Sequence, residues 1–124
     1  MKNYTNQELA NMNRKQITAI AKGLPSILEW NESWTEEQKL IKRKLDCISM
    51  IDSTLIYNEP FLDKPRRYWD GYKTYADPYI KELGEENVYE LYDNRKEYFK
   101  NHVKVNPETH TDSEGVTYKS ITEY

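Results

Sequence analysis

The strongest constraint on the fold is the amphipathic segment from Thr35 to Ile56. Thr35 and Gln38 form a capping box at its start, in which two side chains satisfy the first backbone amides of a helix. Five apolar residues follow at offsets of four, three, three and four: Ile41, Leu45, Ile48, Ile51 and Leu55. This spacing predicts one long helix, which buries its apolar face either within the chain or against a second copy of it.

The residues before this segment predict one or two shorter helices. Thr5 and Glu8 form another capping box. Apolar residues then recur at helical spacing, with a break near Asn13: Leu9, Met12, Ile17, Ile20 and Ala21. Gly23, with Pro25 shortly after it, is a stop signal, so helical structure should end there.

A stripe of tyrosines follows the long segment. Pro65 suits the first turn of a helix, where its missing amide proton is not needed. Four tyrosines come next at offsets of four, three and four: Tyr68, Tyr72, Tyr75 and Tyr79. Asp77 and Pro78 interrupt the stripe and predict the cap and first residue of a new short helix, which closes at Gly84.

A last helix is expected from Glu85 to about His102. Its apolar positions are Val88, Leu91, Tyr92, Phe99 and Val103. Asn106-Pro107 then breaks any helix, and Asp112–Gly115 is typical of a turn. The β-branched and aromatic residues beside this turn predict either a small hairpin with Val103–Val105 or an extended tail that a partner orders.

These elements predict a single domain over residues 1–124. Residues 1–104 would form a helical core, and residues 105–124 an acidic tail. The expected fold class is mainly α: a compact bundle of four to six helices with a short extended or β-hairpin C-terminus.

Composition and charge exclude several classes of protein. The 124 residues carry 18 basic and 21 acidic side chains, a balance that argues against a general nucleic-acid coat protein. No apolar run approaches the roughly 18–20 residues needed to span a bilayer, and no apolar signal region is present at the N-terminus. The single cysteine, Cys47, fits a reducing compartment, so we expect a cytoplasmic protein without a membrane partner. The net charge of −3 lies in residues 105–124, which contain Glu108, Asp112, Glu114 and Glu123.

No pattern of residues predicts catalysis, a metal or a cofactor. A metal site built from His102, His110 and Asp112 lacks the short spacing of a helical histidine pair, so two exposed histidines are the favoured interpretation. Cys47 lies close to the apolar stripe, where a cysteine is usually a small core residue rather than a nucleophile. Only four glycines are present, too few for a glycine-rich phosphate loop. We therefore expect a protein that is not an enzyme.

The segment from Lys64 to Trp69 is the strongest candidate for a partner-binding site. It combines Arg66 and Arg67 with Tyr68 and Trp69 at a predicted helix start, where cations oppose the helix dipole. Arginines beside aromatic rings are typical of nucleic-acid contacts and of protein interfaces. The alternative is that the aromatic rings pack in the core while the arginines pair with carboxylates.

Two further surfaces are candidates. Tyr72, Tyr75 and Tyr79 either pack in the core, as aromatic residues at helical spacing usually do, or lie at its edge and face a partner. The acidic tail either only keeps the protein in solution or approaches a basic groove through Asp112 and Glu114.

The C-terminal string TDSEGVTYKSI, from Thr111 to Ile121, resembles a recurring ending of small phage and prophage proteins of Gram-positive bacteria. The resemblance implies a mobile-element origin and brings no catalytic residues with it. Small proteins of that origin often bind and block a host or defence complex, anti-CRISPR proteins being one group.

We therefore expect a non-catalytic, phage-encoded interaction protein that inhibits a host or defence complex such as a CRISPR effector. Its acidic tail would occupy a groove that otherwise holds nucleic acid. The expected partner-binding residues are Arg66, Arg67, Trp69, Tyr72, Tyr75, Tyr79, Asp112 and Glu114. The alternative is a small phage regulator or replication accessory that binds nucleic acid through the basic-aromatic segment, with an affinity that falls steeply with salt.

Overall fold

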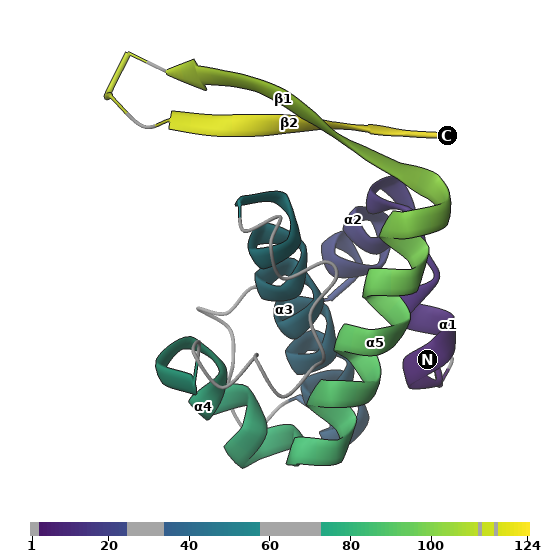
Figure 1. Ribbon diagram of the computed structural model, residues 1–124. Coiled ribbons are helices and arrows are strands. Elements are labelled where there is room, and N and C mark those ends of the chain that lie inside the picture. Colours follow the sequence, from purple (N-terminus) through teal and green to yellow (C-terminus); the bar gives the residue numbers. More distant parts are fainter. Residues whose placement is uncertain (1–2, 25–33, 58–72, 112, 116) are drawn as a thin grey trace.

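The computed structural model describes residues 3–24, 34–57, 73–111, 113–115 and 117–124. These residues form five helices followed by one two-stranded antiparallel sheet (Figure 1). In order, the elements are α1 (Asn6–Ala10), α2 (Arg14–Lys22), α3 (Glu36–Tyr57), α4 (Lys73–Leu83), α5 (Glu85–His102), β1 (Val103–Thr111) and β2 (Thr117–Glu123). The expected mainly α fold with a C-terminal hairpin is confirmed.

Helix α3 is the centre of the fold, since it contacts all four other helices and β2. The capping box at its start is present: Thr35 N donates to Gln38 Oε1 at 3.0 Å, and Gln38 N donates to Thr35 Oγ1 at 3.1 Å. The five residues of its apolar stripe are all buried, as predicted: Ile41, Leu45, Ile48, Ile51 and Leu55. Each buried side chain of this size stabilises the fold by about 1.5–3 kcal/mol.

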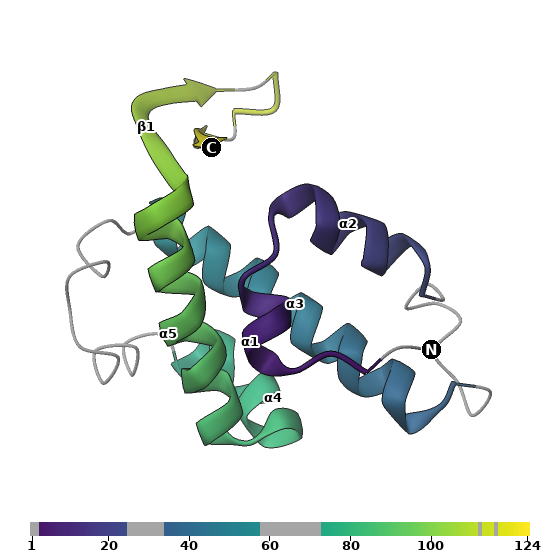
Figure 2. The same ribbon diagram turned by 90° about the vertical axis from the view of Figure 1, so that its right-hand side faces the viewer.

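Two short helices precede α3, and the predicted break at Asn13 separates them. Thr5 and Glu8 make the expected capping box before α1. Asn13 and Gln16 make an equivalent one before α2, with Gln16 N donating to Asn13 Oδ1 at 2.8 Å. The chain turns between α1 and α2 because each helix begins at its own cap (Figure 2).

The predicted start of a helix at Asp77 and Pro78 is wrong. Helix α4 runs from Lys73 through Pro78 to Leu83. Pro78 comes only one turn after the helix begins, so its missing amide proton deprives just the carbonyl of Thr74 of a partner. The predicted end is confirmed: Gly84, at a φ of 90° that favours glycine, separates α4 from α5.

Helix α5 has the predicted bounds and completes the core. Its predicted apolar residues are all buried: Val88, Leu91, Tyr92, Phe99 and Val103. They pack in one cluster with the stripe of α3 and with Leu9 and Ala10 of α1.

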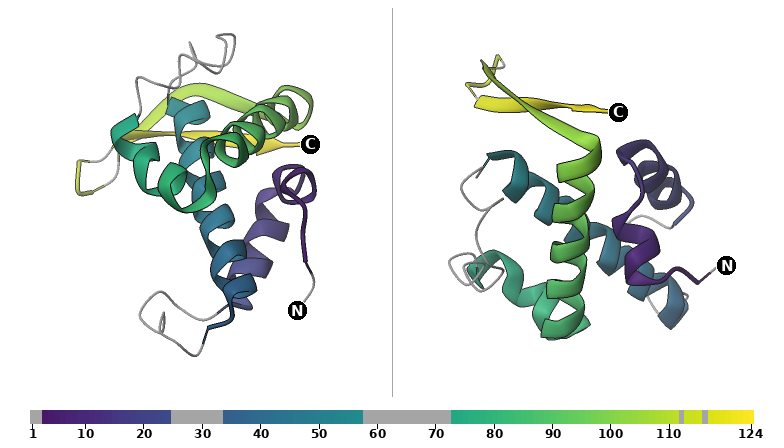
Figure 3. Two further views of the ribbon diagram at one scale, coloured as in Figure 1. Left: turned by 90° about the horizontal axis from the view of Figure 1, so that it is seen from below. Right: turned by 45° about the vertical axis from the view of Figure 1, so that its right-hand side comes forward.

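The last turn of α5 passes directly into β1, so the hairpin lies across one end of the helical body (Figures 1 and 3). Val103 pairs with Glu123, and Val105 pairs with Ile121. The register then shifts before Thr109 pairs with Lys119. Pro107 lies in the bulged stretch, where a residue without an amide proton is tolerated.

Candidate interaction surfaces

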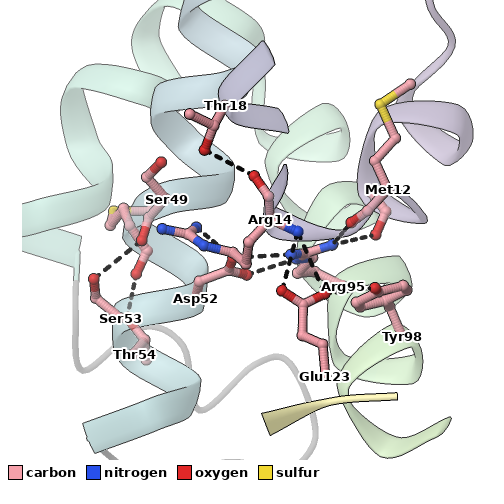
Figure 4. A network of polar contacts seen from close by, with 12 residues as sticks. Met12, Arg14, Thr18, Ser49, Asp52, Ser53, Thr54, Arg95, Tyr98 and Glu123 are labelled. Atoms are coloured by element: carbon pink, nitrogen blue, oxygen red, sulfur yellow. Dashed lines mark hydrogen bonds and ion pairs between the residues drawn. The ribbon is translucent and has the colours of Figure 1, made fainter. Parts of the chain in front are cut away.

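A buried ion pair between α3 and α5 lies at the base of the hairpin (Figure 4). Arg95 Nε donates to Asp52 Oδ1 at 2.6 Å, and Arg95 Nη2 donates to Asp52 Oδ2 at 3.0 Å. Both side chains are almost fully buried, Arg95 at 0% and Asp52 at 2% exposure. Because charges lose their hydration when buried, this two-point geometry is needed to offset the cost.

The remaining donors of Arg95 hold the turn between α1 and α2. Arg95 Nη1 donates to the carbonyl oxygens of Ala10 and Met12. Its guanidinium carbon also lies 4.5 Å from the centre of the Tyr98 ring. Arg95 of α5 therefore holds the C-terminal end of α1, and the turn that follows it, against α3.

Arg14 and Glu123 extend this network to α2 and β2. Arg14 Nη1 donates to Asp52 Oδ2 at 2.7 Å, while its backbone N donates to Glu123 Oε1 at 3.1 Å. Tyr98 Oη donates to the other oxygen of Glu123 at 2.8 Å. Burial, and then this hydrogen bond, raise the pKa of Tyr98 to about 12. We call these five residues, Arg14, Asp52, Arg95, Tyr98 and Glu123, the anchor network.

One feature of the sequence indicates the anchor network: two charged residues occupy positions on the apolar faces of their helices. Arg95 lies four residues after Leu91 and four before Phe99, so it falls on the apolar face of α5. Asp52 follows Ile51 on the buried side of α3. A charge placed on an apolar face requires a buried partner of opposite sign, and that rule points to this pair.

Beyond the anchor network the hairpin is exposed. We call residues 107–111 and 113–115 the hairpin arm, and every one of them is solvent-exposed. The arm carries the carboxylates Glu108 and Glu114, whereas Glu123 is used at the base. Figure 3 shows the arm reaching past the helical body. The hairpin therefore has a fixed base and an acidic, solvated end.

The structure places only part of the predicted partner-binding set. Tyr79 on α4 is half-buried and packs against the core, and burial followed by the charge of Asp46 raises its pKa. Glu114 is exposed at the tip of the arm, and Tyr75 belongs to α4. The remaining predicted residues lie outside the described residues: Arg66, Arg67, Trp69, Tyr72 and Asp112.

The cysteine and the two histidines, the residues considered above for catalysis or metal binding, lie apart in the structure. Cys47 is fully buried, and burial, with the charge of Asp46, raises the pKa of its thiol to about 12, so it behaves as a core residue. His102 ends α5, with Nδ1 at 3.3 Å from the carbonyl oxygen of Tyr124, while His110 lies far along β1. Within the described residues no three metal-ligating side chains come together.

Comparison of the chain with protein-family models, with curated proteins and with solved structures finds no match. None of the described helices has the length and apolar character required to cross a bilayer. Inference about function therefore starts from the surfaces that the fold presents.

Proposed function

We propose that this chain is a non-catalytic interaction protein that docks its hairpin arm onto a basic surface of a partner. The partner we favour is a host or defence complex whose nucleic-acid groove the arm occupies, as in an anti-CRISPR-type inhibitor of phage origin acting in the host cytoplasm. The observation that supports this most is a hairpin anchored at its base by a buried network and exposed at its end.

Packing and hydrogen bonds hold the base of this hairpin to the helices. A two-stranded ribbon is marginally stable by itself in water. Here Val105 and Ile121 pack on the core, and Glu123 accepts hydrogen bonds from both Arg14 and Tyr98. The exposed arm adds little apolar burial of its own. Because the base is already fixed, it does not have to be ordered when the arm binds a partner, which reduces the conformational entropy lost on binding.

The charge of the arm suits a basic partner. Glu108 and Glu114 are exposed there, and Asp112 lies between them in the sequence. Carboxylates along a narrow ribbon would meet the arginines and lysines that otherwise hold phosphates, and would speed association at low salt. β1 and β2 pair only with each other in the described sheet, so each strand also has an outer edge with backbone groups for a partner.

Reversal of the charge of the arm tests this function. The chain is immobilised and exposed to lysate of the host bacterium with and without nuclease treatment; the retained proteins are identified by mass spectrometry, and retained nucleic acid is measured in parallel. We expect one protein partner to bind stoichiometrically and its affinity to fall by about tenfold or more in Glu108→Lys/Glu114→Lys. The matched control is Glu86→Lys/Glu97→Lys, which makes the same charge change at exposed positions of α5.

Equal retention of the partner by both double variants would contradict the role of the arm. Recovery of nucleic acid alone, lost on nuclease treatment, would favour a regulator that binds through Arg66, Arg67, Tyr68 and Trp69. That segment lies outside the described residues and stays a prediction. An Arg66→Ala/Arg67→Ala variant tests it, since salt-dependent binding of nucleic acid should then collapse.

A further inference from the structure

We propose that a basic groove along α2 binds the phosphodiester backbone of nucleic acid without reading its sequence. The groove lies on α2 and the facing side of α3, away from the hairpin arm. It is independent of the basic-aromatic segment and of the function proposed for the arm.

Two adjoining hollows form this groove. One, of about 380 Å³, lies along the exposed side of α2. The other, of about 260 Å³, lies between α2 and α3 and shares Arg14, Thr18 and Lys22 with the first. We call the two hollows together the α2 groove; its polar lining is Arg14, Lys15, Thr18, Lys22, Lys42, Asp46 and Ser49.

The α2 groove is positive in a chain of net negative charge. Residues 9–24 contain three basic side chains and no carboxylate. With Lys42 from α3, four cations line the groove against one carboxylate, Asp46. Since the net charge of −3 lies in residues 105–124, the rest of the chain is balanced, and the groove is a local excess of positive charge on it.

The cations differ in how they are held. Arg14 is fixed by Asp52 at 2.7 Å, yet 42% of its side chain is exposed, so it is oriented in advance and still reaches solvent. Lys42 pairs with Asp46 at 3.2 Å. Lys15 and Lys22 are exposed, and among the described residues neither forms an ion pair with a carboxylate. Two cations are therefore available to an anion, and a third is already positioned.

The spacing and lining favour a phosphate chain over a single phosphate. Lys15 and Lys22 are seven residues apart on α2, about 10 Å along its axis. That distance corresponds to about three base-pair steps along the axis of duplex DNA, so the two lysines would contact different phosphates. Thr18, Ala19 and Ala21 are small and leave the groove open between the two lysines. The described lining contains no aromatic ring on which a base could stack, so the contact would be to the backbone.

Salt titration of DNA binding measures the number of these contacts. Three neutralised phosphates, at Lys15, Lys22 and Arg14, predict a slope of log affinity against log salt of about −2.7, so affinity for a duplex should fall about 40-fold between 50 mM and 200 mM salt. Lys15→Ala/Lys22→Ala removes two contacts, which should reduce that fall to about 3- to 4-fold. The readout is the fluorescence anisotropy of a labelled duplex of arbitrary sequence.

The control variant is Lys81→Ala/Lys100→Ala, which removes two exposed lysines from α4 and α5. Its slope should equal that of the unmodified protein, and circular dichroism should show that both variants are folded. Equal loss in both double variants, or no duplex binding by the unmodified protein at low salt, would overturn the proposal. Displacement of the duplex by inorganic phosphate at millimolar concentration and constant ionic strength would also overturn it, because a single phosphate would then be enough to fill the groove.

Discussion

Replacement of Asp52 by asparagine tests whether the anchor network stabilises the fold. The carboxylate accepts two hydrogen bonds from Arg95 and one from Arg14, all between 2.6 and 3.0 Å. Asp52→Asn keeps the shape but leaves the buried guanidinium of Arg95 without its counter-charge. Removal of one partner from a buried ion pair costs about 3–5 kcal/mol. That is a large part of the roughly 5–15 kcal/mol that stabilises a typical domain.

The free energy of unfolding, measured by urea titration, should therefore fall by about 3–5 kcal/mol, with a decrease in Tm of roughly 10–20 °C. Asp46→Asn is the matched control on the same helix, because Asp46 pairs with Lys42 near the surface, where such a pair contributes only about 0.3–0.5 kcal/mol. A second variant, Asp52→Asn/Arg95→Met, removes both charges and should recover part of the loss. If Asp52→Asn lowered the free energy of unfolding no more than Asp46→Asn does, the ion pair of Asp52 and Arg95 would not stabilise the fold as proposed.

Three further outcomes follow from single residues. Folding favours the neutral phenol of Tyr98, whose pKa is raised from 10.0 to about 12, so its contribution to stability is complete below pH 10 and is lost as the pH rises toward 12. Urea unfolding across that range should show a steeper fall in stability than in Tyr98→Phe, where the raised pKa values of Cys47 and Tyr79 still contribute; parallel curves would contradict the assignment. The buried Cys47 thiol should react with a thiol reagent only on unfolding, and rapid modification of the native protein would show it to be accessible. Gly84→Ala should lower the free energy of unfolding by about 1–2 kcal/mol because Gly84 has a φ of 90°; an unchanged urea midpoint would mean that the turn adapts.

Much of the helical fold could be predicted because its signals are local. The capping boxes at Thr5 and Thr35 and the apolar stripe of α3 are complete within a few turns of chain, and all three are present in the structure. Local signals also produced the one clear error. Asp77 and Pro78 are typical of a helix start, but the preceding turn is helical as well, so Pro78 lies inside α4.

The anchor network could not be predicted in the same way, because it depends on contacts between distant parts of the chain. Arg95 and Asp52 are 43 residues apart, and Arg14 and Glu123 are 109 residues apart. Charged residues are usually exposed, so only their position on apolar faces marked them as exceptions. The α2 groove has a related cause: the sequence of residues 9–24 shows only their apolar spacing, whereas the groove depends on α3 packing beside them.

The direct passage of α5 into β1 has a mechanical consequence. No loop separates His102 from Val103, so a displacement of the hairpin is passed directly to the last turn of α5. The base of the hairpin is held by the anchor network, where Glu123 holds the returning strand to the first turn of α2. A force that pulls on the base of the hairpin therefore acts on the same contacts that join α2, α3 and α5.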